Sequence, residues 1–248
     1  MIDPRTSVID ERLSKIGRIV AVSSGKGGVG KSMVATTLAL TLAKQGCSVG
    51  LFDLDFTSPS THIILGAESV QPKEENGLIP PIVRGLKFMS IIYFVGDKPA
   101  PLRGVDTSNA LIELLTITQW GKLDFLVIDM PPGIGDAVLD LVRLVKRIEF
   151  LIVTTPSLLA FETVKKQVAL LLELKMHVLG IVENMKMDQA GAVKIQTEKL
   201  GLKYLGEIVF DPQVEASIGN EQKLLGTAIG KKMFQIVQTN ILIEREKT

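Results

Sequence analysis

The sequence predicts an α/β fold, in which a doubly wound, mainly parallel sheet carries helices on both faces. Three observations lead to this prediction. Short apolar, β-branched segments alternate with segments of helical periodicity through most of the 248 residues. Hydrophobic residues make up 46% of the chain and the mean hydropathy is +0.30, a bias typical of strands buried on both faces. A glycine-rich segment joins an early strand to a long helix.

Composition narrows the domain organisation and the function classes. We expect a lead-in helix over residues 1–17 and a single domain over residues 18–248, because no linker or repeat divides the chain. The net charge of +1, without a basic block, argues against nucleic acid as a partner. The single cysteine, Cys47, excludes a disulfide within the chain and a multi-cysteine metal site. No apolar run reaches the roughly 18–20 residues of a membrane span, and the first residues lack the apolar core of a signal peptide. These features predict a cytoplasmic protein that does not bind membranes.

Residues 25–32, GKGGVGKS, match the phosphate-loop pattern G-x-x-x-x-G-K-[ST]. Segment 18–23 before them predicts a strand, and segment 34–42 after them repeats apolar residues at helical spacing. Backbone N–H groups of such a loop can face one anion, because glycine tolerates positive φ and lacks a Cβ. We expect Lys31 to reach the β- and γ-phosphates of a nucleotide and Ser32 to ligate Mg²⁺. The nucleotide-binding residues predicted here are Gly25, Lys26, Gly27, Gly28, Val29, Gly30, Lys31, Ser32 and Met33.

Lys26 gives this loop a second lysine, whereas the common pattern needs only Lys31. From its early position the side chain could reach a phosphate bound by a neighbouring subunit, as an arginine finger does. Fingers supplied in trans accelerate hydrolysis by about 10³–10⁵. The alternative is a solvated lysine on an exposed loop.

The next predicted strand, residues 48–53, ends in the acidic residues Asp53 and Asp55. Their i, i+2 spacing places both carboxylates on one side of an extended backbone. Ligands of open α/β sheets bind beyond the carboxyl ends of the strands, where the phosphate loop also lies. One carboxylate could orient an attacking water, and the other could help to hold Mg²⁺ or a loop lysine. Alternatively, Asp53 caps the next turn and Asp55 is solvated.

A second signal of the same kind lies further along the chain. An apolar strand ends in Asp129 and is followed by MPPGIGD at residues 130–136. An apolar strand ending in aspartate, after a phosphate loop, is typical of a Walker B element that holds Mg²⁺ through a water. Pro131, Pro132 and Gly133 restrict the loop that follows, which can respond to the γ-phosphate as switch loops do. An ordinary strand-to-helix turn is the alternative.

The remaining elements are predicted from periodicity and turn signals. Asn184 follows one of the later strands, and its amide offers both a donor and an acceptor to the edge of adenine. The predicted strands are 79–83 and 86–95, paired as a hairpin, then 125–128, 148–154, 178–182 and 204–209. The predicted helices are a short one within 57–66, then 110–120, 158–174, 190–200, 214–218 and 228–241.

Taken together, these segments resemble one family. GKGGVGKS, with its early lysine, resembles the deviant Walker A loop of the MinD/ParA/nitrogenase-iron-protein ATPases. Four further segments are similar to those of the Mrp/ApbC family within that class, namely DLDFTSPS at 53–60, DMPPGIGD at 129–136, TTP at 154–156 and ENM at 183–185. The resemblance implies a P-loop ATPase that dimerises around two ATP molecules and carries or scaffolds iron-sulfur clusters. It also implies a client or scaffold protein as a further partner.

The same resemblance assigns roles to individual residues. Lys26 would cross to the opposite site and act in catalysis with Lys31, while Asp55 would position the attacking water. Asp53 would support the metal or the switch, and Asp129 would be the Walker B acid. The remaining matched positions are Ser32 for Mg²⁺, Asn184 for adenine, and Asp211 and Pro212 for the base or ribose.

The chain departs from that family pattern at two places. Ser58 stands where the family usually has glycine, and the Cys-x-x-Cys expected shortly after ENM is absent, since KMDQAGAV follows Met185. Thiolates are the ordinary ligands of iron-sulfur clusters. The motifs therefore favour a nucleotide-gated cluster carrier or assembly factor that takes ligands from a partner. A MinD/ParA-type regulatory ATPase and a metal- or cofactor-delivery ATPase that binds no cluster itself are the alternatives.

Overall fold

The computed structural model describes residues 3–95, 105–187 and 191–243. Its centre is an eight-stranded sheet with the strand order β10-β9-β8-β1-β7-β2-β6-β5. Neighbouring strands run parallel, except that β5 pairs antiparallel to β6. The bounds are β1 Ile16–Ser24, β2 Val49–Asp53, β5 Ile82–Val83, β6 Leu86–Ser90, β7 Leu123–Asp129, β8 Ile148–Thr154, β9 His177–Lys186 and β10 Tyr204–Val209. A separate two-stranded sheet pairs β3, Lys73–Glu74, with β4, Leu78–Ile79.

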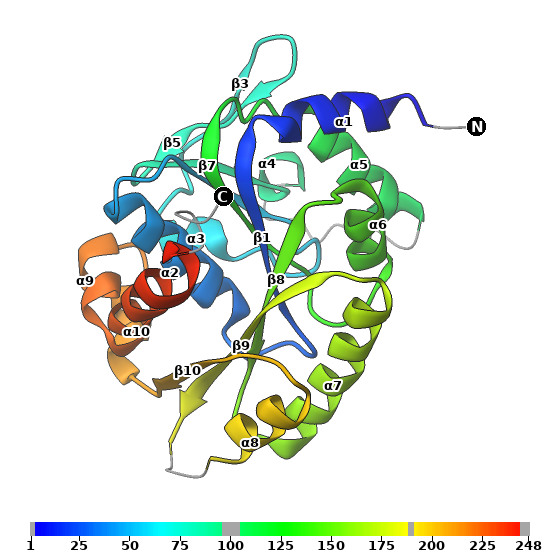
Figure 1. Cartoon of the computed structure of the whole chain (residues 1–248). Coiled ribbons are helices and arrows are strands. Elements are labelled where there is room, and N and C mark those ends of the chain that lie inside the picture. Colours follow the sequence, from blue (N-terminus) through cyan, green and yellow to red (C-terminus); the bar gives the residue numbers. More distant parts are fainter. Residues whose placement is uncertain (1–2, 96–104, 188–190, 244–248) are drawn as a thin grey trace.

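Helices cover both faces of the central sheet (Figure 1). One face carries α1 (Arg5–Ser14), α5 (Val105–Ile117), α6 (Asp136–Leu144), α7 (Leu158–Glu173) and α8 (Ala192–Lys199). The other carries α2 (Lys31–Lys44), α3 (Thr61–Leu65), α9 (Glu221–Gly226) and α10 (Ala228–Ile236). Shorter helical segments are α4 (Ile92–Val95), the 3₁₀ turn η1 (Pro212–Ser217) and the π turn η2 (Val237–Ile241).

The strand period of two explains how one sheet supports two cores. In β1, Ile19 and Ala21 pack into the core beneath α5, α6 and α7, while Val20 and Val22 pack into the core beneath α2 and α10. All four side chains are buried, which is why the strand is apolar without alternation. The predicted doubly wound, mainly parallel sheet is therefore the observed one.

The N-terminal helix packs on the body of the protein. Ile9 and Leu13 of α1 are buried in the same core as α5 and α6. The helix ends at Ser14, and β1 begins at Ile16, inside the predicted lead-in, because Ile16 already pairs with Leu123 of β7. The division into residues 1–17 and 18–248 stays a prediction.

Several element boundaries differ from the predictions. The hairpin joins β5 to β6 through Arg84 and Gly85, which both have positive φ. The predicted strand 86–95 ends early, at Ser90, and a helix begins at Ile92, whose backbone N–H donates to the Ser90 hydroxyl. Ile79 lies in β4, outside that hairpin. Strand β9 runs through Lys186, beyond the predicted end, because β10 pairs along it. The predicted helix 228–241 divides into α10 and the π turn η2, and η1 replaces the predicted helix 214–218.

The topology brings the predicted polar residues to one edge. Strands β8, β1, β7 and β2 are parallel neighbours, so their carboxyl ends meet at the same side of the sheet. The glycine-rich loop leaves β1 there, and Asp53 and Asp129 are paired in register at the ends of β2 and β7. Among the described residues, no helix is long and apolar enough to cross a membrane.

Candidate nucleotide-binding site

The glycine-rich loop between β1 and α2 is shaped by two close approaches. Gly30 caps α2 at φ +79°, and a Cβ there would lie 2.3 Å from Nδ2 of Asn184. A Cβ on Gly25 would lie 2.4 Å from the hydroxyl oxygen and 2.8 Å from the backbone carbon of Thr163 in α7. Glycine is therefore required at both ends of the loop, where it packs against β9 and α7.

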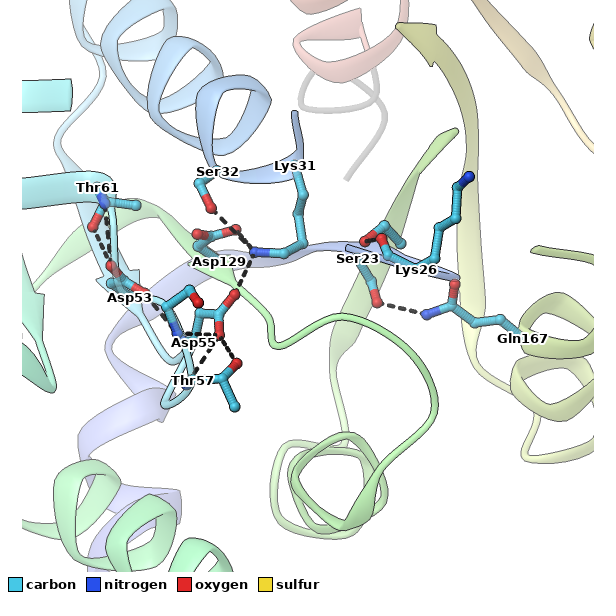
Figure 2. A network of polar contacts seen from close by, with 12 residues as sticks. Ser23, Lys26, Lys31, Ser32, Asp53, Asp55, Thr57, Thr61, Asp129 and Gln167 are labelled. Carbon is cyan, nitrogen blue, oxygen red and sulfur yellow. Dashed lines mark hydrogen bonds and ion pairs between the residues drawn. The ribbon is translucent and has the colours of Figure 1, made fainter. Parts of the chain in front are cut away.

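Lys31 begins α2 and reaches into a buried acidic cluster (Figure 2). Its ammonium nitrogen lies 2.6 Å from Oδ1 of Asp129, 3.5 Å from Oδ2 of Asp55 and 3.2 Å from the hydroxyl of Ser32. The lysine is only 6% exposed. A buried ammonium needs such partners, because an unpaired charge in the interior carries a large desolvation cost. The sequence-predicted Lys31, Ser32, Asp55 and Asp129 thus converge on one point.

Asp129, at the end of β7, has a donor set that suits a hard cation. Its burial raises the pKa of this carboxyl from 3.8 to about 7, with the nearby Asp53 adding to the effect and Lys31 opposing it. Its Oδ2 atom has no hydrogen-bond partner among the described residues. A buried carboxylate oxygen without a donor, beside the Ser32 hydroxyl, fits Mg²⁺, which prefers oxygen ligands.

Asp53, which the sequence also predicts as a metal ligand and switch residue, is fully buried, and both of its carboxylate oxygens accept hydrogen bonds. Its Oδ1 accepts the backbone N–H of Asp55 at 3.0 Å. Its Oδ2 accepts the hydroxyl of Thr61 at 2.6 Å and the backbone N–H of Thr61 at 3.3 Å. Burial raises the pKa of Asp53. In this arrangement Asp53 fixes the chain that follows β2, and its role as a metal ligand stays a prediction.

The proline-rich loop after β7 lies against the phosphate loop. The N–H of Gly133 donates to the carbonyl of Ser24 at 2.7 Å, and Gly133 takes up φ +85°. Pro132 lines the same cavity as Lys31 and Asp55. The loop formed by Pro131, Pro132 and Gly133 thus lies against the phosphate loop, and its role as a switch stays a prediction.

Lys26 is exposed, and its side chain points away from the buried acidic cluster (Figure 2). Its backbone carbonyl accepts the Ser24 hydroxyl at 2.9 Å, which fixes the start of the loop. The structure therefore does not bring the Lys26 ammonium to the acidic cluster of its own chain. This placement is compatible with both alternatives, a solvated lysine and a lysine that acts in trans.

Two connected pockets extend from this cluster. The first, of about 580 Å³, is lined by Ser24, by the phosphate loop from Lys26 to Met33 except Val29, and by Asp55, Thr57, Ser58, Ser60, Ile63, Ile64, Pro132, Glu215 and Ile218. The second, of about 270 Å³, is lined by Gly30, Met33, Asn184, Met185, Ile208, Val209, Phe210, Asp211, Pro212, Val214, Glu215 and Ile229. They share Gly30, Met33 and Glu215. The first pocket contains the charged side chains of Lys31 and Asp55 and several hydroxyl groups, which suit the phosphates of a nucleotide. The second is walled mainly by apolar side chains, which suit the base.

The predicted base-binding residues do line the apolar pocket. Nδ2 of Asn184 donates to the carbonyl of Val29 at 2.9 Å, which ties the end of β9 to the phosphate loop. Asp211 accepts the backbone N–H groups of Gln213 and Ala228, both at 2.9 Å, and these bonds lower its pKa. Asp211 therefore acts as a cap that shapes the loop around Pro212, and its predicted contact with the base or ribose stays a prediction.

Sequence reasoning missed residues of two kinds. The first are Thr57 and Thr61, whose hydroxyls hold Asp55 and Asp53, although a threonine soon after an aspartate is a recognised turn signal. The second are apolar side chains of the second pocket, which we call the base pocket, such as Phe210 and Ile229. An apolar residue at the end of a strand carries no chemical signature that separates a ligand contact from core packing.

A glycine loop that opens a helix, a lysine between two buried carboxylates and an adjoining base pocket define a P-loop NTPase site. The ParA model, described as the NUBPL iron-transfer P-loop NTPase, matches residues 15–242. The chain belongs to this family, which confirms the resemblance found in its motifs.

Two curated relatives support the same assignment. The chain is 39% identical over 220 residues to an iron-sulfur cluster carrier protein of Aquifex aeolicus, covering 82% of this chain and 60% of the relative. It is 41% identical over 219 residues to the chloroplastic Fe-S cluster assembly factor HCF101 of Arabidopsis thaliana, covering 83% of this chain and 41% of the relative. The chain thus spans only about half the length of these relatives.

Solved structures confirm the fold. A nucleotide-binding protein of Archaeoglobus fulgidus in complex with ADP is 33% identical, with a TM-score of 0.73 over 95% of this chain and 94% of its own. The cell division ATPase MinD of Pyrococcus furiosus is 22% identical, with a TM-score of 0.67 over 93% of this chain and 99% of its own. The second likeness bears on the fold alone.

Proposed function

We propose that the protein binds and hydrolyses ATP with Mg²⁺, and acts as a nucleotide-gated dimer in the assembly or carriage of iron-sulfur clusters. The observation that carries the ATPase part is the buried Lys31 between Asp129 and Asp55, at the base of a pocket that continues into an apolar one. The family and the ADP complex of a relative that is 33% identical support nucleotide as the ligand.

Each residue has a task that its position permits. Backbone N–H groups of the loop and the N-terminus of α2 bind the phosphates, and the Lys31 ammonium pairs with the charge of the β- and γ-phosphates. Asp55 accepts a hydrogen bond from the attacking water and orients it toward the γ-phosphate. Ser32 and Asp129 would hold Mg²⁺, which neutralises charge that develops on the phosphate oxygens. Asn184 and the apolar pocket hold the base.

Lys26 provides the reason to propose a homodimer. Its exposure, and its direction away from the acidic cluster of its own chain, support a role at the nucleotide of a second copy. A cation supplied in trans stabilises the charge of the transition state and couples hydrolysis to dimer formation.

The iron-sulfur part of the proposal rests on the family and on the carrier proteins that the chain resembles. The chain's own cysteine, Cys47, is buried at 8% exposure, and the described residues hold no group of three or more His, Cys, Asp or Glu side chains that could bind a metal. We therefore propose that a client or scaffold protein supplies the cluster ligands. The second candidate, favoured by the absent Cys-x-x-Cys, is a MinD/ParA-type or cofactor-delivery ATPase that binds no cluster.

Two measurements test these functions separately. The purified protein should hydrolyse ATP in the presence of Mg²⁺, and Asp55→Asn should bind ATP with near-normal affinity but turn over at least about 10²-fold more slowly. Normal turnover by Asp55→Asn would remove Asp55 from its role. For the cargo, anaerobic reconstitution with iron and sulfide, with and without a candidate client protein, is followed by the absorption spectrum and the iron content. A cluster that forms only with the client supports the proposal, whereas none under either condition supports the second candidate.

A cytoplasmic location is part of the proposal, supported by the single buried thiol. The alternative is an organelle, since two relatives are chloroplastic. Fractionation of cells followed by immunodetection distinguishes the two compartments.

A further inference from the structure

The two oxygens of the Asp55 carboxylate have different surroundings. Oδ1 accepts three hydrogen bonds, from the Thr57 hydroxyl at 2.6 Å, the Thr57 N–H at 3.2 Å and the Ser58 N–H at 3.1 Å. Oδ2 lies 3.5 Å from the ammonium nitrogen of Lys31. Because a carboxylate oxygen has two lone-pair directions, three donors saturate Oδ1. Oδ2 is then the Asp55 oxygen that can accept a hydrogen bond from a water in the phosphate pocket.

The three donors to Oδ1 differ in what they depend on. The two N–H groups belong to the backbone turn and persist with any side chain at these positions. The hydroxyl of Thr57 makes the shortest of the three contacts and is the only side-chain donor among them (Figure 2). The terminal torsion of an aspartate is broad and roughly two-fold, so the carboxylate has more freedom to turn on the two longer N–H bonds alone than with the short hydroxyl contact added.

Asp53, two residues before Asp55, offers the contrasting case through its contact with Thr61. The Thr61 hydroxyl bonds Oδ2 of Asp53 at 2.6 Å, and the N–H of Asp55 bonds Oδ1 at 3.0 Å. Both oxygens of Asp53 are thereby occupied, and Thr61 is fully buried. Thr57, by contrast, is exposed and lines the phosphate pocket. Thr61 thus bonds an aspartate whose two oxygens are both occupied inside the core. Thr57 bonds an aspartate whose second oxygen stays open to the pocket.

We propose that Thr57 is a positioning residue for ATP hydrolysis, whose hydroxyl holds the Asp55 carboxylate so that Oδ2 faces the attacking water. This inference rests on the proposed role of Asp55. It assigns a function to a residue that no motif of the sequence singles out. Thr57 touches neither the water nor the nucleotide in this role, and acts through Asp55.

The test compares two substitutions of Thr57. Thr57→Val keeps the shape of the side chain and removes the hydroxyl, whereas Thr57→Ser keeps the hydroxyl. We expect kcat of Thr57→Val to fall about tenfold with the KM for ATP within about twofold, because orientation is lost and binding is not. Thr57→Ser should recover kcat to within about twofold. The control Thr116→Val removes a hydroxyl that bonds the carbonyl of Ile112 in α5, on the face of the sheet opposite to α2, and should leave kcat unchanged.

Three results would overturn the proposal. They are an unchanged kcat in Thr57→Val, a rise in KM without a fall in kcat, and a fall in Thr57→Ser equal to that in Thr57→Val. Thr57→Val is further combined with Asp55→Asn, where the hydroxyl should have no additional effect on the residual rate. If Asp55→Asn itself turns over normally, the proposed function of Asp55 fails. If Asp55→Asn is slow and Thr57→Val is normal, only the role of Thr57 fails.

Discussion

The two ends of the nucleotide site are built on different principles. At the phosphate end, Lys31, Asp55 and Asp129 are charged and nearly buried, with exposures of 6%, 5% and 0%. At the base end, Val209 and Phe210 are apolar and remain 57% and 48% exposed. Buried charges must be matched by partners at fixed distances, whereas an apolar wall needs only surface of about the right shape.

That difference separates what each end can contribute. In the proposed function, the groups at the phosphate end would orient water and stabilise charge, so changes there should alter the rate of hydrolysis. The base end would supply contact area and a few hydrogen bonds that act equally on substrate and transition state, so changes there should alter affinity. A substitution at the phosphate end that changed only the affinity for ATP, or one at the base end that changed only kcat, would contradict this comparison.

The largest effect is expected from Lys26→Ala. If the ammonium reaches the nucleotide of a second copy, its loss should lower kcat by about 10³-fold while the dissociation constant for ATP changes little. Steady-state hydrolysis and ATP titration measure the two quantities. Lys165→Ala, which removes a half-buried lysine of α7 paired with Glu162, serves as the control and should retain kcat. Normal hydrolysis by Lys26→Ala would leave the solvated lysine as the correct interpretation.

The second prediction concerns the charge buried at Asp129. Its folded-state pKa of about 7 lies above the ordinary 3.8, so unfolding releases a proton between these values. The contribution of this carboxyl to stability is therefore full below about pH 4 and is lost as the pH rises through about 7. Because asparagine does not titrate in this range, Asp129→Asn does not lose this stability as the pH rises. Without nucleotide and with a chelator present, the Tm of Asp129→Asn relative to the wild type should rise by about 5 °C from pH 5 to pH 8. A constant difference across that range would show that the buried carboxyl titrates normally.

At the base end, Asn184→Ala should weaken ATP binding about fivefold and leave kcat within about twofold. The substitution removes the amide that faces the base pocket and its bond to the Val29 carbonyl, and one such hydrogen bond contributes roughly 1 kcal/mol. Isothermal titration with ATP measures the affinity. Asn240→Ala, on the π turn η2, is the control and should not change it. A large fall in kcat would show that Asn184 also sets the geometry of the phosphate loop.

The same contrast explains how much of the molecule could be predicted from sequence. The fold follows from the alternation of buried strands and amphipathic helices, and the convergence of Asp55 and Asp129 follows from parallel strands that end at one edge. The phosphate loop is evident because Gly25 and Gly30 meet steric limits that only glycine satisfies. At this end, chemistry restricts the residue type, so the residue type is informative.

The rest could not be predicted because it depends on tertiary contacts between common residues. The packing of Thr163 against Gly25 joins α7 to a loop that lies more than a hundred residues earlier in the chain, and no pattern in either segment predicts this contact. The extension of β9 through Lys186 depends on pairing with β10, since Glu183 and Asn184 alone are poor strand formers. The base pocket is completed by the turn η1, whose side chains resemble those of any exposed turn.

The smallest effect is expected from Phe210→Ala, which tests the apolar wall itself. Phe210 lines the base pocket and is 48% exposed, so a bound base can cover only part of its ring. Burying that part contributes on the order of 0.5–1 kcal/mol, which corresponds to a loss of about threefold in ATP affinity without a change in kcat. Phe234→Ala, on α10 outside the base pocket, removes a phenyl ring of the same 48% exposure and should leave ATP affinity unchanged. Equal effects from both substitutions would mean that the change reflects general loss of surface packing. A tenfold or larger loss from Phe210→Ala alone would show that the base stacks on this ring, and the base end would then depend on one specific side chain.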